Sequence, residues 1–230
     1  MSRSPAQASS PPGPSPLAYV ARPQGDAAGK VLVLHAWWGL NDFMRGLCDR
    51  FAGQGLLAAA PDLYEGEIAR TPQEAETLRD KPRREPAGAL VVRAVHRLVA
   101  EAPAHGRPIG VVGFSMGGYW AFELAKDPEL PIGATVVFYE AYARGDYAKS
   151  RSAFQAHYAE TDPFVPEDER ERLARTLAAA NKVPDFHVYP GTGHWFFESD
   201  RPDAYNEIAA RLAWRRTLAF LRSHLAEGAG

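Results

Sequence analysis

The sequence has little cysteine, no long apolar stretch and no excess of charge. Its single cysteine, Cys48, excludes an internal disulfide and a zinc site with several cysteine ligands. No apolar run reaches the roughly 20 residues that a membrane-spanning helix needs, so we expect no membrane partner. The 26 basic and 28 acidic residues give a formal net charge of −2, whereas a nucleic-acid-binding domain usually has a basic face. We therefore expect a globular, cytoplasmic protein with no nucleic-acid partner.

The first 16 residues, MSRSPAQASSPPGPSP, contain five prolines and no large apolar residue after Met1. Such a segment has nothing to bury and predicts a disordered tail. It does not resemble a secretory signal, because no apolar run follows Arg3. We predict that residues 17–226 form the folded domain, for which a content of 46% hydrophobic residues is ample.

Strand and helix patterns alternate along this domain. Apolar runs predict strands over 30–34, 56–60, 108–114, 134–139, 152–158 and 185–189, with a short edge strand over 17–21. Amphipathic segments predict helices over 41–54, 86–100, 116–126, 166–181 and 202–225, and residues 71–85 fit a surface helix or a loop. The alternation is typical of an α/β protein whose mainly parallel sheet has helices on both faces. Such sheets bind ligands beyond the carboxyl ends of their strands.

The segment Gly113-Phe114-Ser115-Met116-Gly117 has the pattern Gly-x-Ser-x-Gly and lies between a predicted strand and a predicted helix. This is the context of a nucleophile elbow, in which a sharp turn lifts the serine above the sheet. The two glycines remove side chains that would clash in that turn. The alternative is a glycine-rich turn that only packs a helix on a strand. We predict that Ser115 is a nucleophile, which requires a base and, to orient it, a carboxylate.

The carboxylate is expected in the loop after the strand over 152–158. Asp162 lies there, just before a predicted helix, and Pro163 restricts the turn that holds it. Glu160 is the nearest competitor. The alternative role of Asp162 is to cap this turn without taking part in catalysis.

The base is expected after the last strand. His194 follows Gly193 there, and it is the only one of the seven histidines in a glycine-rich strand-end loop after Asp162. The order Ser115, Asp162, His194 along the chain is that of the α/β-hydrolases. We therefore predict these three residues as a catalytic triad.

An oxyanion hole is the next requirement of such a site. In this fold one backbone N–H group comes from the loop after the first buried strand, and the other comes from the residue that follows the nucleophile. This predicts the N–H groups of Trp37 and Met116. The alternative for Trp37 and for its neighbour Trp38 is simple packing.

An aromatic, mostly apolar pocket is expected around the triad. For each residue expected to form a wall of this pocket, the alternative is an ordinary position in the hydrophobic core. These walls are Trp38, Tyr64, Tyr139 and Trp195.

These stretches together resemble the dienelactone hydrolase family of α/β-hydrolases. The matching segments are 35–41, 54–64, 113–118, 162–166 and 193–197, spread over nearly the whole predicted domain. The resemblance implies an α/β-hydrolase fold without a large cap domain, and no metal ion or organic cofactor. It also implies a small-molecule ester or lactone as the partner. The chain itself is expected to be a monomer or a small homo-oligomer.

The sequence departs from the best-known members of that family at three positions. Those members have a cysteine nucleophile and a glutamate in the first oxyanion loop, where this chain has Ser115 and Ala36. They also hold a substrate carboxylate with arginines, one of them four residues after the base. This chain has Glu198 there, which we expect to repel anionic substrates. Other arginines that lie in a region able to supply this contact are Arg79, Arg83 and Arg84.

The predicted function is hydrolysis of small esters or lactones through an acyl-enzyme on Ser115. One alternative keeps the same triad but passes the acyl group to an acceptor other than water, as in an acyltransferase. Another is a non-catalytic ligand-binding protein built on the same fold. Cys48 lies on the apolar stripe of a predicted helix, which favours a buried structural thiol over a nucleophile.

Overall fold

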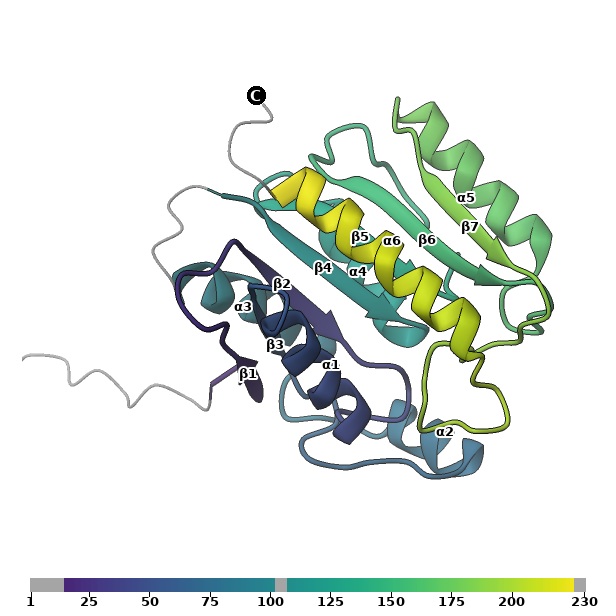
Figure 1. Ribbon diagram of the computed structural model, residues 1–230, viewed down its shortest axis with the longest axis horizontal. Coiled ribbons are helices and arrows are strands. Elements are labelled where there is room, and N and C mark those ends of the chain that lie inside the picture. The colour runs from purple at the N-terminus through teal and green to yellow at the C-terminus, as the bar shows by residue number, and fades with distance from the viewer. Residues whose placement is uncertain (1–14, 102–106, 226–230) are drawn as a thin grey trace, which may run out of the picture.

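The computed structural model describes residues 15–101 and 107–225 (Figure 1). Most of the predicted tail, residues 1–14, lies outside the described part of the chain, as does residue 226 at the end of the predicted domain. None of the helices in the described ranges is both long enough and apolar enough to cross a membrane.

Seven strands form one sheet in the order β1-β3-β2-β4-β5-β6-β7. Only β1 is antiparallel to its neighbour; the other five pairings are parallel. The strands are β1 (Tyr19–Ala21), β2 (Gly29–Leu34), β3 (Leu56–Ala60), β4 (Ile109–Phe114), β5 (Ile132–Phe138), β6 (Ala153–Ala159) and β7 (Asp185–Tyr189). Strands β2, β3 and β4 are buried at every residue, as expected for strands covered on both faces.

Helices cover both faces of this sheet. They are α1 (Asp42–Ala52), α2 (Pro72–Asp80), α3 (Ala87–Ala100), α4 (Met116–Ala125), α5 (Glu167–Ala179) and α6 (Glu207–Leu225). In Figure 1, α1 and α6 lie in front of the sheet, and α3 and α4 lie behind it. The prediction of an α/β fold with a mainly parallel sheet is thus confirmed. The stretch 65–85 contains only the nine-residue α2, which is far smaller than a cap domain.

The last helix of the chain, α6, begins later than predicted. We expected it over 202–225, but α6 starts at Glu207. Asn206 caps the N-terminus of this helix, because its side chain accepts a hydrogen bond from the backbone N–H of Ala209 at 3.0 Å. This is the capping bond that starts a helix, and it places residues 202–206 in the loop that follows His194.

The parallel topology brings four loops to one edge of the sheet. His35 follows β2, Ser115 follows the central β4, Asp162 follows β6 and His194 follows β7. Because β2, β4, β5, β6 and β7 all run in the same direction, these loops lie at the same end of their strands. The predicted site residues therefore meet at the carboxyl edge of the sheet.

The turn between β4 and α4 is strained and tightly packed. Ser115 has φ +47°, in the region that non-glycine residues rarely adopt. A Cβ on Gly113 would lie 2.3 Å from the carbonyl oxygen of Gly117, and a Cβ on Gly117 would lie 2.2 Å from that of Leu34. Only glycine fits at either position, so the backbone of the turn can approach both α4 and β2.

We predict that Gly113→Ala destabilises the protein by about 1–3 kcal/mol, because the new methyl group must displace backbone atoms. The matched control is Gly46→Ala on α1, where a Cβ meets nothing within 4 Å. That change should be neutral or stabilise the helix by up to about 1 kcal/mol. Urea denaturation measures both effects. Equal stability of the two variants would contradict the packing described for the turn.

Candidate active site

Ser115, His194 and Asp162 form one hydrogen-bonded chain. The Nε2 atom of His194 lies 3.1 Å from Oγ of Ser115. Its Nδ1 atom lies 2.7 Å from Oδ2 of Asp162. A carboxylate can only accept, so Nδ1 carries the proton and Nε2 is free to accept the proton of the serine hydroxyl. This is the arrangement that a serine nucleophile requires.

The loop after β6 holds Asp162 in place. Its Oδ1 atom accepts hydrogen bonds from the backbone N–H groups of Phe164 at 2.9 Å and Val165 at 3.2 Å. This leaves Oδ2 for His194, and only 2% of the Asp162 side chain is exposed. The competitor, Glu160, is exposed and instead accepts from the backbone N–H of Gly191 at 2.9 Å.

The two predicted oxyanion donors lie on segments that are in contact. Met116 is the first residue of α4, where helical N–H groups have no partner within the helix. Trp37 lies in the loop after β2, and Gly117 packs directly on the carbonyl groups of that strand end. The backbone hydrogen bonds of residues 15–101 and 107–225 include none donated by the N–H of Trp37 or Met116.

A cleft of about 430 Å³ opens beside His194. Phe164 and Trp195 flank the histidine, with ring centroids 4.9 Å and 4.8 Å from its own. The guanidinium of Arg201 lies 3.6 Å from the ring centroid of Trp38. The full lining is Trp38, Arg70, Pro72, Thr161, Pro163, Phe164, Gly193, His194, Trp195, Asp200, Arg201, Pro202, Asp203 and Ala204.

Two of the four expected pocket walls do not line this cleft. Trp38 and Trp195 line it and Tyr64 and Tyr139 do not, although Trp38 and Tyr64 are equally buried, each 3% exposed. The Tyr64 hydroxyl donates to Sδ of Met116 at 3.3 Å, and the ring of Tyr139 lies 4.7 Å from that of His194. Both tyrosines contact residues of the site but lie outside the lining of this cleft, so their role as pocket walls stays a prediction.

Sequence reasoning missed several side chains of the cleft, among them Arg70, Phe164 and Arg201. Phe164 could have been found, because it lies two residues after Asp162 in the same loop. The two arginines lie in loops without periodicity, which offer no comparable signal. Of the arginines considered instead, none lines the cleft: Arg79 binds Asp80, Arg83 binds Glu67 and Arg84 binds Glu65.

The expectation that Glu198 repels anionic substrates is wrong. Its side chain is fully buried, and its Oε1 atom accepts a hydrogen bond from the Tyr139 hydroxyl at 2.7 Å. Burial away from water raises the pKa of Glu198 to about 8, so the carboxyl is mostly neutral at pH 7. It neither reaches the cleft nor carries a full charge.

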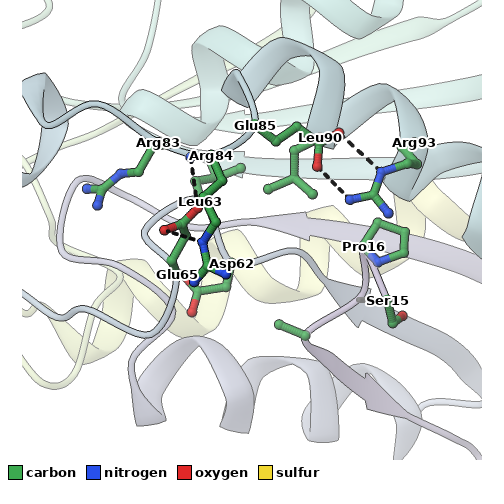
Figure 2. Close-up of a pocket in the computed structure, with 11 residues that line it drawn as sticks. Ser15, Pro16, Asp62, Leu63, Glu65, Arg83, Arg84, Glu85, Leu90 and Arg93 are labelled. Atoms are coloured by element: carbon green, nitrogen blue, oxygen red, sulfur yellow. Dashed lines mark hydrogen bonds and ion pairs between the residues drawn. The ribbon is translucent and has the colours of Figure 1, made fainter. Parts of the chain in front are cut away.

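Another pocket, of about 360 Å³, lies between the start of the described chain and the loop after β3 (Figure 2). It contains none of the predicted site residues. Its charges are paired: Arg93 binds Glu85, and Arg84 binds Glu65 (Figure 2). Nothing in this pocket resembles a second set of nucleophile and base.

The thiol of Cys48 and the side chains that could hold a metal ion bear on alternative chemistry. Cys48 is buried on α1, and desolvation raises the pKa of its thiol to about 12, so it is neither accessible nor ionised at neutral pH. In the ranges that the structure describes, no group of three or more histidine, cysteine, aspartate or glutamate side chains is placed to hold a metal ion.

The sheet order, the elbow after β4 and the loops after β6 and β7 define an α/β-hydrolase fold. A family model described as "Dienelactone hydrolase family" matches residues 17–225. The chain belongs to the dienelactone hydrolase family, as the sequence motifs predicted, and the prediction that it is a hydrolase is confirmed.

Individual relatives agree with this assignment. "Protein usf" of Aquifex pyrophilus is 33% identical, over 90% of this chain and 93% of its own. A "Probable 2-oxo-3-(5-oxofuran-2-ylidene)propanoate lactonase" of Bradyrhizobium is 29% identical, over 93% and 91%. A solved structure described as a "Putative Dienelactone Hydrolase" from Klebsiella pneumoniae superposes with a TM-score of 0.74 at 25% identity, over 87% and 90% of the two chains.

The buried Glu198 predicts a pH-dependent stability. Between the ordinary pKa of 4.5 and about 8, folded Glu198 keeps a proton that the unfolded chain has released. The free energy of unfolding should therefore fall as pH rises through this window, by up to about 1.4 kcal/mol per pH unit. Glu198→Gln, which stays neutral, should reduce this slope when urea denaturation is repeated from pH 5 to pH 8.

The matched control for this experiment is Glu76→Gln on α2, which replaces an exposed carboxyl. It should keep the slope of the unmodified protein. A slope in Glu198→Gln as steep as that of the unmodified protein would contradict the contribution assigned to Glu198.

Proposed function

We propose that this protein hydrolyses small esters or lactones through an acyl-enzyme on Ser115. The observation that carries the proposal is the hydrogen-bonded chain from Oγ of Ser115 through both ring nitrogens of His194 to Oδ2 of Asp162. A base in contact with the hydroxyl, itself oriented by a carboxylate, is what makes a serine nucleophilic at neutral pH.

In the first half of the reaction, Oγ of Ser115 bonds to the carbonyl carbon of the substrate while Nε2 of His194 takes the hydroxyl proton. The carbonyl oxygen becomes an oxyanion, which accepts hydrogen bonds from the backbone N–H groups of Trp37 and Met116. Asp162 stabilises the imidazolium that forms. Collapse of the tetrahedral adduct breaks the ester bond, and the proton on Nε2 passes to the departing alkoxide.

In the second half, a water molecule gives a proton to Nε2 of His194 and attacks the acyl carbon. The bond to Oγ of Ser115 then breaks, the serine regains its proton, and the carboxylic acid is released. Water is the acceptor favoured by the open cleft, since α2 is the only helix between β3 and α3 and the described residues form no cap domain that would exclude solvent.

The cleft and the family support small esters or lactones as the substrate class. Phe164, Trp195 and Trp38 offer flat apolar surfaces beside His194, and a volume of about 430 Å³ suits a small molecule. The Bradyrhizobium relative is named as a lactonase, which supports lactones as one group of substrates. The positive charges of Arg70 and Arg201 balance the negative charges of Asp200 and Asp203. The lining therefore has no net negative charge that would repel an anionic substrate.

Ser115→Ala should abolish hydrolysis of p-nitrophenyl esters, because Ser115 is the only hydroxyl or thiol among the described residues that is hydrogen-bonded to His194. The measurement is kcat/KM over a series of acyl chain lengths, with circular dichroism to confirm that the variant folds. Hydrolysis by folded Ser115→Ala at the steady-state rate of the unmodified protein would contradict the proposal.

Asp162→Asn should lower kcat by about 10⁴, because an amide favours the wrong tautomer of the histidine. Glu160→Gln is the matched control, as Glu160 lies two residues away on the same loop but binds only Gly191. It should keep kcat within about twofold, as expected for an exposed residue outside the chain of hydrogen bonds. Equal losses in the two variants would contradict the role of Asp162.

A further inference from the structure

His35 is a fully buried histidine that the proposed reaction does not use. It follows β2 directly, and both of its ring nitrogens bind backbone groups. The Nδ1 atom lies 2.7 Å from the carbonyl oxygen of Ala36. The Nε2 atom lies 3.1 Å from the backbone nitrogen of Leu63, in the loop after β3.

These two partners define a single protonation state of the ring. A carbonyl oxygen only accepts, so Nδ1 must carry a proton; a backbone N–H only donates, so Nε2 must be bare. A doubly protonated ring would lose the bond from Leu63. Burial also lowers the pKa of His35, which keeps the ring neutral. His35 is thus a fixed link between two loops.

The bond to Ala36 acts on the peptide that carries an oxyanion donor. The carbonyl of Ala36 and the N–H of Trp37 belong to the same planar trans peptide, so they point in opposite directions. Fixing the direction of this carbonyl fixes the direction of that N–H. The same carbonyl also accepts from the backbone N–H of Gly39 at 3.2 Å, which closes the turn on its other side.

We propose that His35 is a positioning residue, whose Nδ1–H group locks the Ala36–Trp37 peptide so that the Trp37 N–H faces the oxyanion. This inference rests on the proposed function, because it assumes that Trp37 is an oxyanion donor. His35 touches no substrate; it acts through the peptide next to it.

The loop after β3 gives this lock a rigid support. Asp62 accepts hydrogen bonds from the backbone N–H groups of Tyr64 at 2.9 Å and Gly66 at 2.7 Å, which fixes the turn that presents Leu63 to His35. Figure 2 shows Asp62, Leu63 and Glu65 together on this loop. The ring of Tyr64 packs edge-on against His35 at 5.2 Å.

The same loop also contacts the second donor. The hydroxyl of Tyr64 donates to Sδ of Met116 at 3.3 Å, and the backbone N–H of Met116 is the other predicted oxyanion contact. His35 and Tyr64 therefore connect both sides of the oxyanion hole to one turn.

The first test reads the protonation state without any substitution. Two-dimensional ¹H–¹⁵N spectra of the ¹⁵N-histidine-labelled protein, assigned through nuclear Overhauser contacts between the His35 ring and the amide proton of Leu63, should show Nδ1 of His35 protonated and Nε2 bare across the pH range of activity. A ring protonated on Nε2 would overturn the proposal, because Nδ1 could then not donate to Ala36.

The second test uses a matched pair of variants. His35→Asn places an amide N–H near the position of Nδ1 and can still bind the Ala36 carbonyl. His35→Gln places its amide oxygen at the position of Nε2 and can still accept from Leu63, which leaves no N–H group at the position of Nδ1 to donate to Ala36. Both lose one of two bonds, so a purely structural role predicts similar effects of the two changes.

We expect His35→Gln to lower kcat by about 10-fold or more with KM within about threefold, since loss of an entire oxyanion donor costs about 10²–10³. His35→Asn should retain most of kcat. A trifluoromethyl ketone forms an oxyanion when its carbonyl carbon bonds to Oγ of Ser115. Affinity for this ketone should fall in parallel with kcat in His35→Gln. Equal activity of the two folded variants, or unchanged ketone affinity, would overturn the proposal.

Failure of this inference is distinguishable from failure of the proposed function. If Ser115→Ala is inactive, and the ketone binds covalently to the unmodified protein but not to Ser115→Ala, the acyl-enzyme proposal stands regardless of the role of His35. Activity that survives in Ser115→Ala removes the proposed function and this inference with it. Should both His35 variants fail to fold, the protonation state of the unmodified protein decides.

Discussion

The contact between the start of α4 and the end of β2 is the constraint on which the site depends. Gly117 lies so close to the carbonyl groups of Leu34 and His35 that a Cβ atom would be 2.2 Å and 2.7 Å from their oxygens. Two backbone segments at this distance leave no room for adjustment. Ser115 and the loop that carries Trp37 are therefore held next to each other, and the other loops of the site are arranged around this pair.

Strain is concentrated at the same edge of the sheet. Ser115, Tyr139 and Trp195 have φ values of +47°, +43° and +66°, and each lies in a loop or turn after a strand. Such conformations cost roughly 1–3 kcal/mol each and persist only where packing determines them. Here Phe138 and Phe197 pack behind the site with ring centroids 4.5 Å apart. The buried pair of Tyr139 and Glu198 adds a hydrogen bond to this layer.

Much of this arrangement could be predicted from the sequence because it depends on local patterns. The glycines around Ser115 and the turn residues after the strands of Asp162 and His194 indicated which residues follow which strands, and parallel topology then brings them to one edge. The apolar runs likewise predicted the bounds of each strand to within about two residues.

The rest depends on contacts between distant parts of the chain. No local pattern indicates that Glu198 turns inward to Tyr139, which is 59 residues away, so its burial and its neutral state could not be predicted. The same holds for Arg70 and Arg201 in the cleft lining, and for Tyr64 beneath Met116. The late start of α6 depends on a single capping bond of Asn206.

The most direct test of the central claim is rapid-quench kinetics with p-nitrophenyl acetate, followed by mass spectrometry of the quenched protein. A covalent acyl-enzyme predicts a gain of one acetyl group on the peptide that contains Ser115, formed at least as fast as the steady-state turnover. Turnover with no acetyl group on Ser115 at any time, under conditions where the acyl form should accumulate, would contradict the account.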